Sequence, residues 1–219
     1  MGALLRSEWY KFRKSNALPL LLAGPFVAFL IGMAVFVRFE GAEINEWLGI
    51  LFPVNITYGL LLLPLITGVL AGLVCRYEHV EGGWKQLLTL PVSRGKVFVA
   101  KYVFLLLLVL AIQLLYFAAV FAAGKVQGIS DPFPLDLVLK SAFGGWVASF
   151  PLVALQLWMS IMFKSFAAPF AVNVIFTLPS IMAVQSKTIG PYYPWGQPFF
   201  MMNLGGSTDE LFFVPASQL

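Results

Sequence analysis

The residues best suited to chemistry lie in one polar stretch, residues 76–101, between two long apolar runs. The stretch holds five of the fourteen Lys and Arg residues, two of the ten acidic residues and the only histidine, His79. Side chains of these types form ion pairs and hydrogen bonds, so the stretch is suited to contacts at a surface. A polar segment that joins two membrane spans faces water, and its basic excess predicts that this water is the cytoplasm.

Within this stretch, residues 84–89 have the pattern of a short amphipathic helix. Trp84, Leu87 and Leu88 stand at positions i, i+3 and i+4, so they share one helical face. A glycine pair precedes the segment, and Pro91 ends the helical pattern after it. We expect this helix to lie across the cytoplasmic face of a membrane. There it either anchors the loop or presents its apolar side chains to another protein.

The rest of the sequence offers no catalytic constellation. The expected membrane spans contain no Asp, Glu, Lys, Arg or His, which argues against a proton-coupled carrier, because such carriers need ionisable groups within the membrane. The single cysteine, Cys75, excludes an internal disulfide and a metal site built from cysteines. The phosphate-binding motif G-x-x-x-x-G-K-[ST] is absent. We therefore expect no enzyme activity, no cofactor and no metal, and any transport would need an outside energy source.

The elements that position the polar stretch are predicted to be membrane helices. The chain is 60% hydrophobic and 11% charged, whereas a soluble domain carries about 25% charged residues. So little charge could not cover a soluble surface. The sequence therefore predicts an all-α polytopic membrane protein, with residues 1–219 in a single transmembrane domain. The net charge of +4 comes from basic residues beside the spans, so topology explains it and no nucleic-acid partner is expected.

The apolar runs predict five spans, preceded by a basic amphipathic helix at residues 4–14 that lies in the headgroup layer. The predicted spans are residues 17–37, 47–75, 102–123, 141–163 and 165–186. Ser93 is the predicted N-cap of the helix that carries the third span, and Pro64 is expected to kink the second. Small residues recur every four positions in the first two spans, which predicts close helix approach. They are Gly24, Ala28 and Gly32 in the first span and Gly68 and Gly72 in the second.

The distribution of basic residues predicts a cytoplasmic N-terminus in a multi-pass protein of the cell (plasma) membrane. With this orientation ten Lys and Arg residues lie in cytoplasmic segments and four in outer segments. Five spans would leave residues 187–219, an aromatic proline-rich loop and a tail, on the outside. Two explanations stay open: a sixth span is missing through truncation or a frameshift, or a five-span protein is genuine.

Few polar side chains interrupt the predicted spans. Gln113, Gln156 and Asn173 are the candidates for lining a translocation path, because an amide group in lipid is costly unless it is hydrogen-bonded. The same side chains could instead hydrogen-bond between helices, each bond contributing on the order of 0.6 kcal/mol. The sequence leaves both roles open.

Taken together, these features resemble the permease subunits of ABC-2-type transporters, in particular the branch tied to lantibiotic immunity and antimicrobial-peptide export. The resemblance covers most of the chain and rests on four features. They are the basic amphipathic start LLRSEWYK at residues 4–11, the loop with LPVSR at residues 90–94 and AK at residues 100–101, the alternation of spans, and YPW at residues 193–195.

The resemblance implies a partner and a mechanism. The helix around residues 83–90 would be a coupling helix that docks in a groove of a separate ATP-binding subunit. The residues implied at this interface are Glu78, Glu81, Gly83, Trp84, Leu87, Leu88 and Arg94. Movement of the ATP-binding subunits would tilt the second and third spans and change access to the interface between two permeases. Family members have six spans and pair as homo- or heterodimers, a pattern from which this chain departs at its C-terminus.

Two further hypotheses compete with an ATP-driven export or immunity permease. A non-transporting membrane scaffold or accessory subunit would explain the missing sixth span and the absence of charge within the predicted spans. In that role the charged side chains of the loop would only be solvated at the membrane surface. An intramembrane enzyme is the weakest hypothesis, because no catalytic constellation can be assembled. The substrate and the direction of transport do not follow from the sequence.

Overall fold

The computed structural model describes residues 1–15, 17–37, 45–79, 83 and 93–203, and every regular element within these residues is helical. The all-α prediction is therefore confirmed. In chain order the elements are α1 (Gly2–Lys14), α2 (Leu20–Ala34), α3 (Trp47–Thr57), the π-helix η1 (Tyr58–Leu62), α4 (Leu63–His79), α6 (Arg94–Val126), α7 (Leu135–Met162), α8 (Ala167–Thr177), α9 (Ser180–Ala183), the 3-10 helix η2 (Gly190–Tyr192) and α10 (Gln197–Met202).

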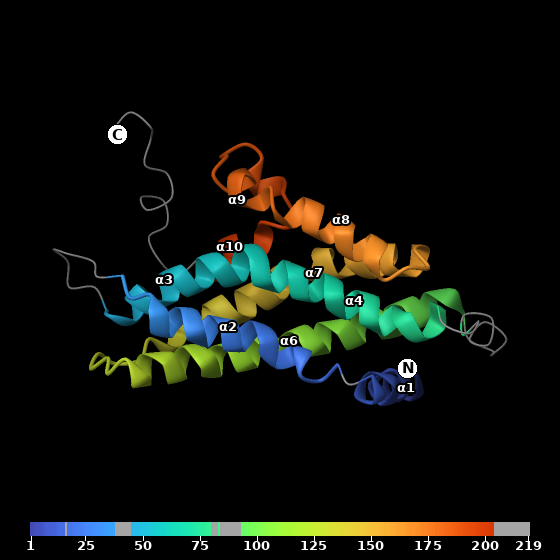
Figure 1. The fold of residues 1–219 in the computed structure, drawn as a ribbon, viewed down its shortest axis with the longest axis horizontal. Coiled ribbons are helices and arrows are strands. Elements are labelled where there is room, and N and C mark those ends of the chain that lie inside the picture. The colour runs from blue at the N-terminus through green and yellow to red at the C-terminus, as the bar shows by residue number, and fades with distance from the viewer. Residues whose placement is uncertain (16, 38–44, 80–82, 84–92, 204–219) are drawn as a thin grey trace.

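Four long helical segments run along the long axis of the molecule (Figure 1). They are α2, the continuous segment from α3 through η1 to α4, α6 and α7. Helix α2 packs on α6, α6 on α7, and α7 on α4, while α8 packs on α4 and α10 on α7. Large apolar side chains such as Leu70, Ile112 and Leu157 are fully buried between these helices. The core of the molecule is therefore the interior of a helical bundle.

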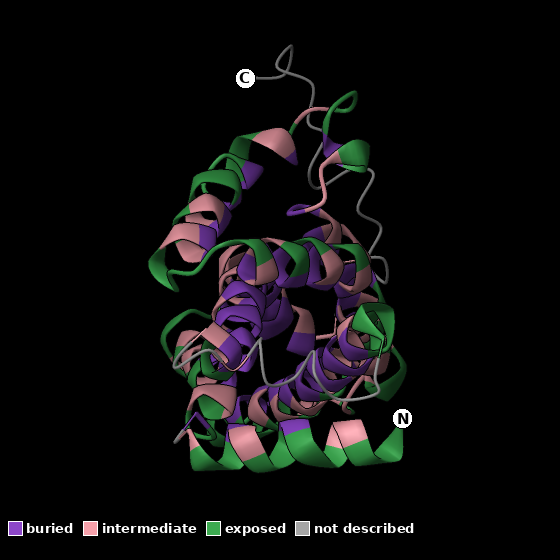
Figure 2. Cartoon of the chain, turned by 90° about the vertical axis from the view of Figure 1, so that its right-hand side faces the viewer, coloured by how far each residue is buried: buried purple, intermediate pink, exposed green. Residues whose placement is uncertain are grey.

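Helix α1 lies across one end of this bundle. It is seen end-on in Figure 1 and from the side, beneath the other helices, in Figure 2. Phe12 is buried against the bundle, whereas Trp9 and Tyr10 are exposed. This geometry agrees with a helix that lies in the headgroup layer, as the amphipathic pattern of residues 4–14 predicts.

In the described part of the chain three helical segments are long and apolar enough to cross a membrane: Trp47–His79, Arg94–Val126 and Leu135–Met162, with 33, 33 and 28 residues. The first and fifth predicted spans contain shorter apolar helices, Leu20–Ala34 and Ala167–Ala183, below the roughly 20 residues that a crossing needs. The second of these is interrupted where α8 ends and the four-residue α9 begins after Pro179, because proline lacks the N–H that a continuous helix requires. The number of crossings stays a prediction.

The second predicted span accommodates Pro64 by a change of helix type. Residues Tyr58–Leu62 form a π-helix directly before the turn that contains Pro64, which is a common site for such an insertion. Proline cannot donate to the carbonyl of Leu60 four residues earlier. The hydroxyl of Ser180 lies 3.4 Å from that oxygen, but it has a single hydrogen, and its shorter bond is to the Thr177 carbonyl oxygen at 2.6 Å.

Small residues bring the helices into close contact, as their spacing predicts. A methyl group at Gly32 would lie 2.9 Å from the Cβ of Ala123 in α6. A methyl group at Gly68 would lie 2.1 Å from the amide nitrogen of Asn173 in α8, and one at Gly72 would lie 2.7 Å from the Phe166 ring. The two glycines of α4 therefore form the surface on which α8 packs.

We expect Gly124→Ala to lower the free energy of unfolding by about 1–2 kcal/mol. A Cβ at this position in α6 would lie 2.1–2.7 Å from the buried Trp47 ring, and overpacking costs about 1–3 kcal/mol. The gain in helix propensity, about 1 kcal/mol at most, offsets only part of this cost. Gly95→Ala in the same helix is the control, because nothing lies within 4 Å of its Cβ position. Denaturant unfolding of the purified variants measures both; equal stability of the two would contradict the packing described here.

Helix α6 begins at Arg94, ahead of the predicted third span, which begins at residue 102. Ser93 caps it, as predicted: its Oγ accepts a hydrogen bond from the backbone N–H of Lys96 at 3.4 Å. The end of the polar stretch is therefore helical, and Lys101 lies within α6. The N-cap could be predicted from residues next to each other in the sequence, whereas the burial of Lys101 depends on the helices that pack around it.

Candidate functional site

A buried cluster of four charged side chains joins three helices at the end of the bundle where α1 lies. Glu8 and Lys11 come from α1, Glu78 from α4 and Lys101 from α6. Lys101 is 0% exposed, and the two carboxylates are 6% and 3% exposed. With two lysines and two glutamates the cluster has no net charge, which is the condition under which charged groups are tolerated in a protein interior. We call these four residues the ion cluster.

Lys101 is the centre of the ion cluster. Its ammonium group donates to Glu8 Oε2 at 2.8 Å, to Glu78 Oε1 at 2.9 Å and to the backbone carbonyl oxygen of Val74 at 2.9 Å. An ammonium group has three N–H donors, so all of them are used. Because the acceptors belong to α1 and α4, the single side chain of Lys101 ties α6 to both of the other helices.

Lys11 closes the ion cluster from the α1 side. It donates to Glu8 Oε1 at 2.8 Å and to Glu78 Oε1 at 2.7 Å. Burial lowers the pKa of the Lys11 ammonium, but its hydrogen bonds to Glu78 and Glu8 outweigh burial, so the pKa is raised above its usual value. Lys11 is therefore protonated at neutral pH, and it remains partly accessible to water.

The local sequence explains how the residues of α1 reach the ion cluster. Glu8 and Lys11 are three residues apart and so lie on one helical face, next to Phe12, whose ring makes an edge contact with Phe104 of α6 at 5.8 Å. The aromatic contact and the ion pairs hold the same face of α1 against the bundle. Trp9 adds a second edge contact with Phe104 at 6.5 Å.

The position of the ion cluster indicates that it connects helices to one another. Glu78 lies one residue before the end of α4, and Lys101 lies in the first part of α6. These helices flank residues 80–92, so the cluster fixes the two helices on either side of that segment to each other and to α1. Among the described residues no group of three His, Cys, Asp or Glu side chains could hold a metal ion.

The structure places three of the seven residues expected at a partner interface. Glu78 belongs to the ion cluster. Arg94 is exposed at the start of α6, and Gly83 lies against the end of α4, where a Cβ would be 2.8 Å from the carbonyl oxygen of Tyr77. The other four, Glu81, Trp84, Leu87 and Leu88, lie outside the described residues, as does the amphipathic helix predicted at residues 84–89. Their contact with a partner stays a prediction.

The prediction that the whole of residues 76–101 faces water is wrong for two of the charged residues. Glu78 and Lys101 are buried in helices. The predicted spans end at the nearest charged residue, whereas the helices that contain the second and third spans continue through Glu78 and Lys101. The signal that could have found the cluster is the pairing of opposite charges at the ends of neighbouring helices, Glu78 after the second span and Lys101 before the third.

The three amide side chains proposed to line a path are all buried. Asn173 is the centre of a hydrogen-bond network: its Oδ1 accepts from Gln156 Nε2 at 2.7 Å and from Trp195 Nε1 at 2.8 Å, and its Nδ2 donates to the Pro64 carbonyl oxygen at 2.9 Å. Gln113 differs, because neither atom of its amide has a hydrogen-bond partner among the described residues. The structure therefore separates Gln156 and Asn173, which bond to each other, from Gln113.

A second buried polar group lies near Gln113. The Tyr116 hydroxyl donates to Asn55 Oδ1, and the Asn55 and Ser141 side chains both donate to the carbonyl oxygen of Met202, at 3.1 and 2.6 Å. These bonds join α3, α6, α7 and α10 in the middle of the bundle. The side chains of Asn55, Tyr116 and Ser141 therefore each have a hydrogen-bond partner within the chain.

Comparison with known proteins gives a family and a relative. The family model described as ABC-2 family transporter protein matches residues 4–180. The bacitracin transport permease protein BCRB of Bacillus licheniformis is 26% identical over 131 residues, which are 58% of this chain and 62% of that relative. The similarity thus spans less than two thirds of the relative's length. No solved structure matches the chain.

Proposed function

Because the chain belongs to the ABC-2 family of transporter proteins, we propose that it is the membrane permease subunit of an ATP-driven exporter. A separate ATP-binding subunit performs the hydrolysis, and a second copy of the chain or a homologous permease completes the transporter as a homo- or heterodimer. The chain lies in the cell membrane with α1 and residues 76–101 on the cytoplasmic side. The ten-to-four distribution of basic residues supports this orientation.

The observation that carries the proposal is the ion cluster. An ATP-binding subunit that moves residues 80–92 can change the bundle only if the flanking helices move with that segment. Lys101 bonds α6 to Glu78 at the end of α4 and to Glu8 of α1, so the flanking helices form one unit. Buried ion pairs with good geometry resist separation, because breaking one leaves an uncompensated charge. Force applied to the connector is therefore passed to α4 and α6 together.

The surface that receives the ATP-binding subunit is built by Trp84, Leu87 and Leu88, which fill a groove of that subunit as aromatic and apolar anchors do at binding hot spots. Glu81 and Arg94 make charged contacts around them. Gly83 itself lies against the end of α4, where a side chain would meet the Tyr77 carbonyl. Glu78 contributes from inside the ion cluster, by holding the base of the connector.

The translocation path passes Gln113. Its amide lies in the bundle interior without a partner among the described residues, and a buried amide in that state is costly unless a transported group or water binds it. A Cβ at Gly145 would lie 2.4 Å from Gln113 Nε2, so the glycine leaves the space that this amide occupies. Gln156 and Asn173 support the path by holding α7, α8 and α4 together.

The substrate is an antimicrobial peptide, and the transporter exports it or confers immunity to it. The similarity to a bacitracin transport permease supports this substrate class, as does the resemblance of the loop and the N-terminal helix to the lantibiotic-immunity branch. The buried amides at Gln113 and Gln156 provide neutral hydrogen-bonding groups, which suit peptide bonds better than they suit ions.

Affinity capture from membranes tests the proposal. The full chain should recover an ATP-binding protein with a Walker A motif. Trp84→Ala is expected to weaken this association by about 2 kcal/mol, or roughly 30-fold, the effect of losing a central aromatic anchor. Glu81→Lys is expected to weaken it less and to make it sensitive to salt. Both variants should lower survival in the presence of the peptide.

Glu46→Lys is the matched control, because Glu46 is exposed at the start of α3, at the end of the bundle away from α1 (Figure 1). It should leave the association unchanged. If Trp84→Ala and Glu81→Lys left both the association and the resistance unchanged, the connector would not be the coupling element. If deletion of the gene changed neither peptide survival nor peptide movement, the scaffold hypothesis would replace the exporter.

A further inference from the structure

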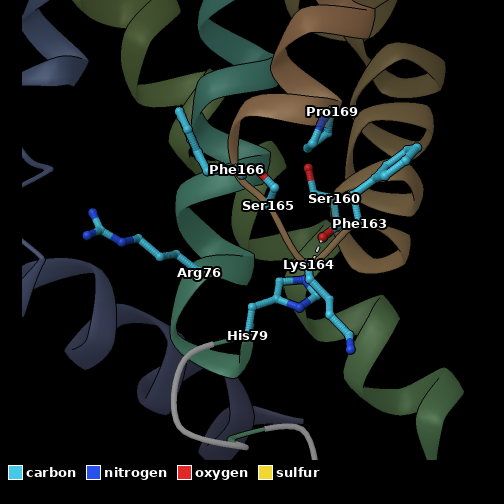
Figure 3. A pocket seen from close by; sticks show the side chains of 9 residues that line it. Arg76, His79, Ser160, Phe163, Lys164, Ser165, Phe166 and Pro169 are labelled. Carbon is cyan, nitrogen blue, oxygen red and sulfur yellow. Dashed lines mark hydrogen bonds between the residues drawn. The ribbon is translucent and has the colours of Figure 1, made fainter.

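A pocket lies at the junction of α4, α7 and α8 (Figure 3). Its volume is about 190 Å³, roughly six times the ~30 Å³ that one water molecule occupies in the liquid. It is built by the end of α4, the end of α7 and the first residues of α8. Of these helices, α4 also carries Glu78 of the ion cluster. The lining residues are Gly72, Arg76, His79, Ser160, Phe163, Lys164, Ser165, Phe166 and Pro169.

The lining, as far as the described residues form it, is basic and contains no acidic side chain. Arg76 and Lys164 are charged and exposed, and the His79 ring is held in place because its Nε2 donates to the Ser160 carbonyl oxygen at 2.8 Å. Figure 3 shows His79 and Lys164 beneath Ser160, whereas the Arg76 side chain extends from α4 in the direction away from them. Glu78, the acid nearest in sequence to Arg76 and His79, is bonded to Lys11 and Lys101 instead. The pocket is therefore suited to an anion.

A buried hydroxyl group without a partner points to a ligand. Ser160 is 2% exposed, and its Oγ has no hydrogen-bond partner among the described residues. An unpaired buried hydroxyl is costly, yet this one lies in the wall of the pocket, where a bound group could accept its hydrogen. The Ser165 hydroxyl accepts from the N–H of Ala167 at the start of α8, so the positive end of the α8 dipole also faces this region.

The rim of the pocket is apolar, which indicates where the anion comes from. Phe163 and Phe166 are exposed beside it, and so is Met162 at the end of α7. A soluble phosphate ion would make no favourable contact with these apolar side chains. The acyl chains of a phospholipid, in contrast, would lie against them while its headgroup entered the pocket. Basic pockets between membrane helices bind anionic headgroups in this way.

We propose that the pocket formed by Arg76, His79, Ser160 and Lys164 binds the phosphate headgroup of an anionic phospholipid. The lysine and the arginine supply the charge, the Ser160 hydroxyl donates a hydrogen bond to a phosphate oxygen, and the phenylalanine side chains contact the acyl chains. The site joins the ends of α4 and α7 to the start of α8. The lipid is thus a structural partner of the same helix end that carries Glu78 of the ion cluster.

Binding of short-chain lipids to the purified full chain tests this site. The probes are dihexanoyl phosphatidylglycerol, dihexanoyl phosphatidylcholine and inorganic phosphate, measured by calorimetry in a neutral detergent at about 0.15 M salt, where distant charges are screened. We expect phosphatidylglycerol to bind more tightly than the other two probes. Arg76→Gln with Lys164→Gln should weaken its binding about 30-fold, since each basic side chain contributes roughly five- to sixfold. Ser160→Ala, a smaller change, should weaken it about fivefold.

The matched control is Arg13→Gln with Lys96→Gln, which removes the same two residue types from exposed positions outside the pocket. It should leave the affinity for phosphatidylglycerol unchanged, and Lys164→Arg should retain most of it. Equal losses in the control and the pocket variant would overturn the site, as would equal binding of phosphatidylcholine. Inorganic phosphate binding as tightly as the lipid would overturn the lipid assignment. So would a pocket variant that keeps its lipid affinity but loses the captured ATP-binding protein, because the basic surface would then belong to the protein interface.

Discussion

Lys101→Met is expected to lower the free energy of unfolding by about 3–5 kcal/mol, the cost of breaking a buried ion pair by removing one partner. Methionine keeps the length of the side chain but removes the charge. Glu8 and Glu78 would then remain buried with only Lys11 between them, and the Val74 carbonyl oxygen would lose its donor. Denaturant unfolding of the purified chain in detergent, together with its abundance in membranes, measures the effect.

Two variants separate the ion cluster from a general effect of substitution. Lys96→Met removes an exposed lysine from the same helix, and we expect it to change the stability by less than about 0.5 kcal/mol. Adding Glu8→Gln to Lys101→Met removes one carboxylate charge with the lysine and leaves Glu78 paired with Lys11, and it should recover most of the loss, because no buried charge is left unpaired. Stability of Lys101→Met equal to that of Lys96→Met would show that the cluster does not hold the helices together.

The ion cluster also connects stability to transport. A variant in which the ion cluster no longer bonds α1 to α4 and α6 should still capture the ATP-binding protein through residues 80–92. Its peptide resistance should fall, because movement of the connector no longer moves α4 and α6 as one unit. Capture of the ATP-binding protein without peptide resistance therefore indicates that the ion cluster no longer connects the helices. Loss of capture is the signature of a damaged docking surface, which Trp84→Ala is designed to produce.

Asn173→Leu is expected to lower the free energy of unfolding by about 2–4 kcal/mol. Leucine has nearly the same shape but leaves two groups without a partner, the Gln156 amide N–H and the Trp195 indole N–H. It also removes one of the two hydrogen bonds to the Pro64 carbonyl, which keeps its bond from Thr67 Oγ1. Three interhelical bonds at about 0.6 kcal/mol each set the lower figure, and leaving buried polar groups unsatisfied raises it. Unfolding in detergent gives the value, with Asn203→Leu as the control.

Asn203 suits this comparison because, among the described residues, its side chain bonds only the Phe199 carbonyl oxygen one turn earlier in α10. Its replacement should cost about 1 kcal/mol or less. A double-mutant cycle between Asn173→Leu and Gln156→Leu should show strong coupling, since the two amides are in direct contact. Additive effects, or a loss of resistance at full stability in Asn173→Leu, would instead assign Asn173 to the translocation path.

The elements that follow from local sequence were predictable. The low charge content requires a membrane environment, and a chain in lipid must satisfy its backbone groups within helices, which the all-α structure agrees with. The Ser93 cap is a signal of a few residues and is present. The small residues of the first two spans also lie at close contacts, because a residue without a side chain marks a close approach whatever the partner.

The helix ends and the pairing of charges were not predictable in the same way. Hydropathy ends a span at the first charged residue, so Glu78 and Lys101 were placed in water although both continue their helices into a buried contact. The break at Pro179 and the π-helix before Pro64 likewise lie within runs that hydropathy treats as continuous spans.

From its residues alone the chain can be recognised as a helical membrane protein with a polar connector and without a G-x-x-x-x-G-K-[ST] motif, because composition and periodicity act over short distances along the chain. The meeting of Lys101 with Glu8, 93 positions away, depends on how α1 crosses the bundle, and nothing local specifies that crossing. The same holds for the pocket of Arg76, Ser160 and Lys164, whose residues come from separate helices. Burial, and with it the energy of each charge, is a property of the packed bundle.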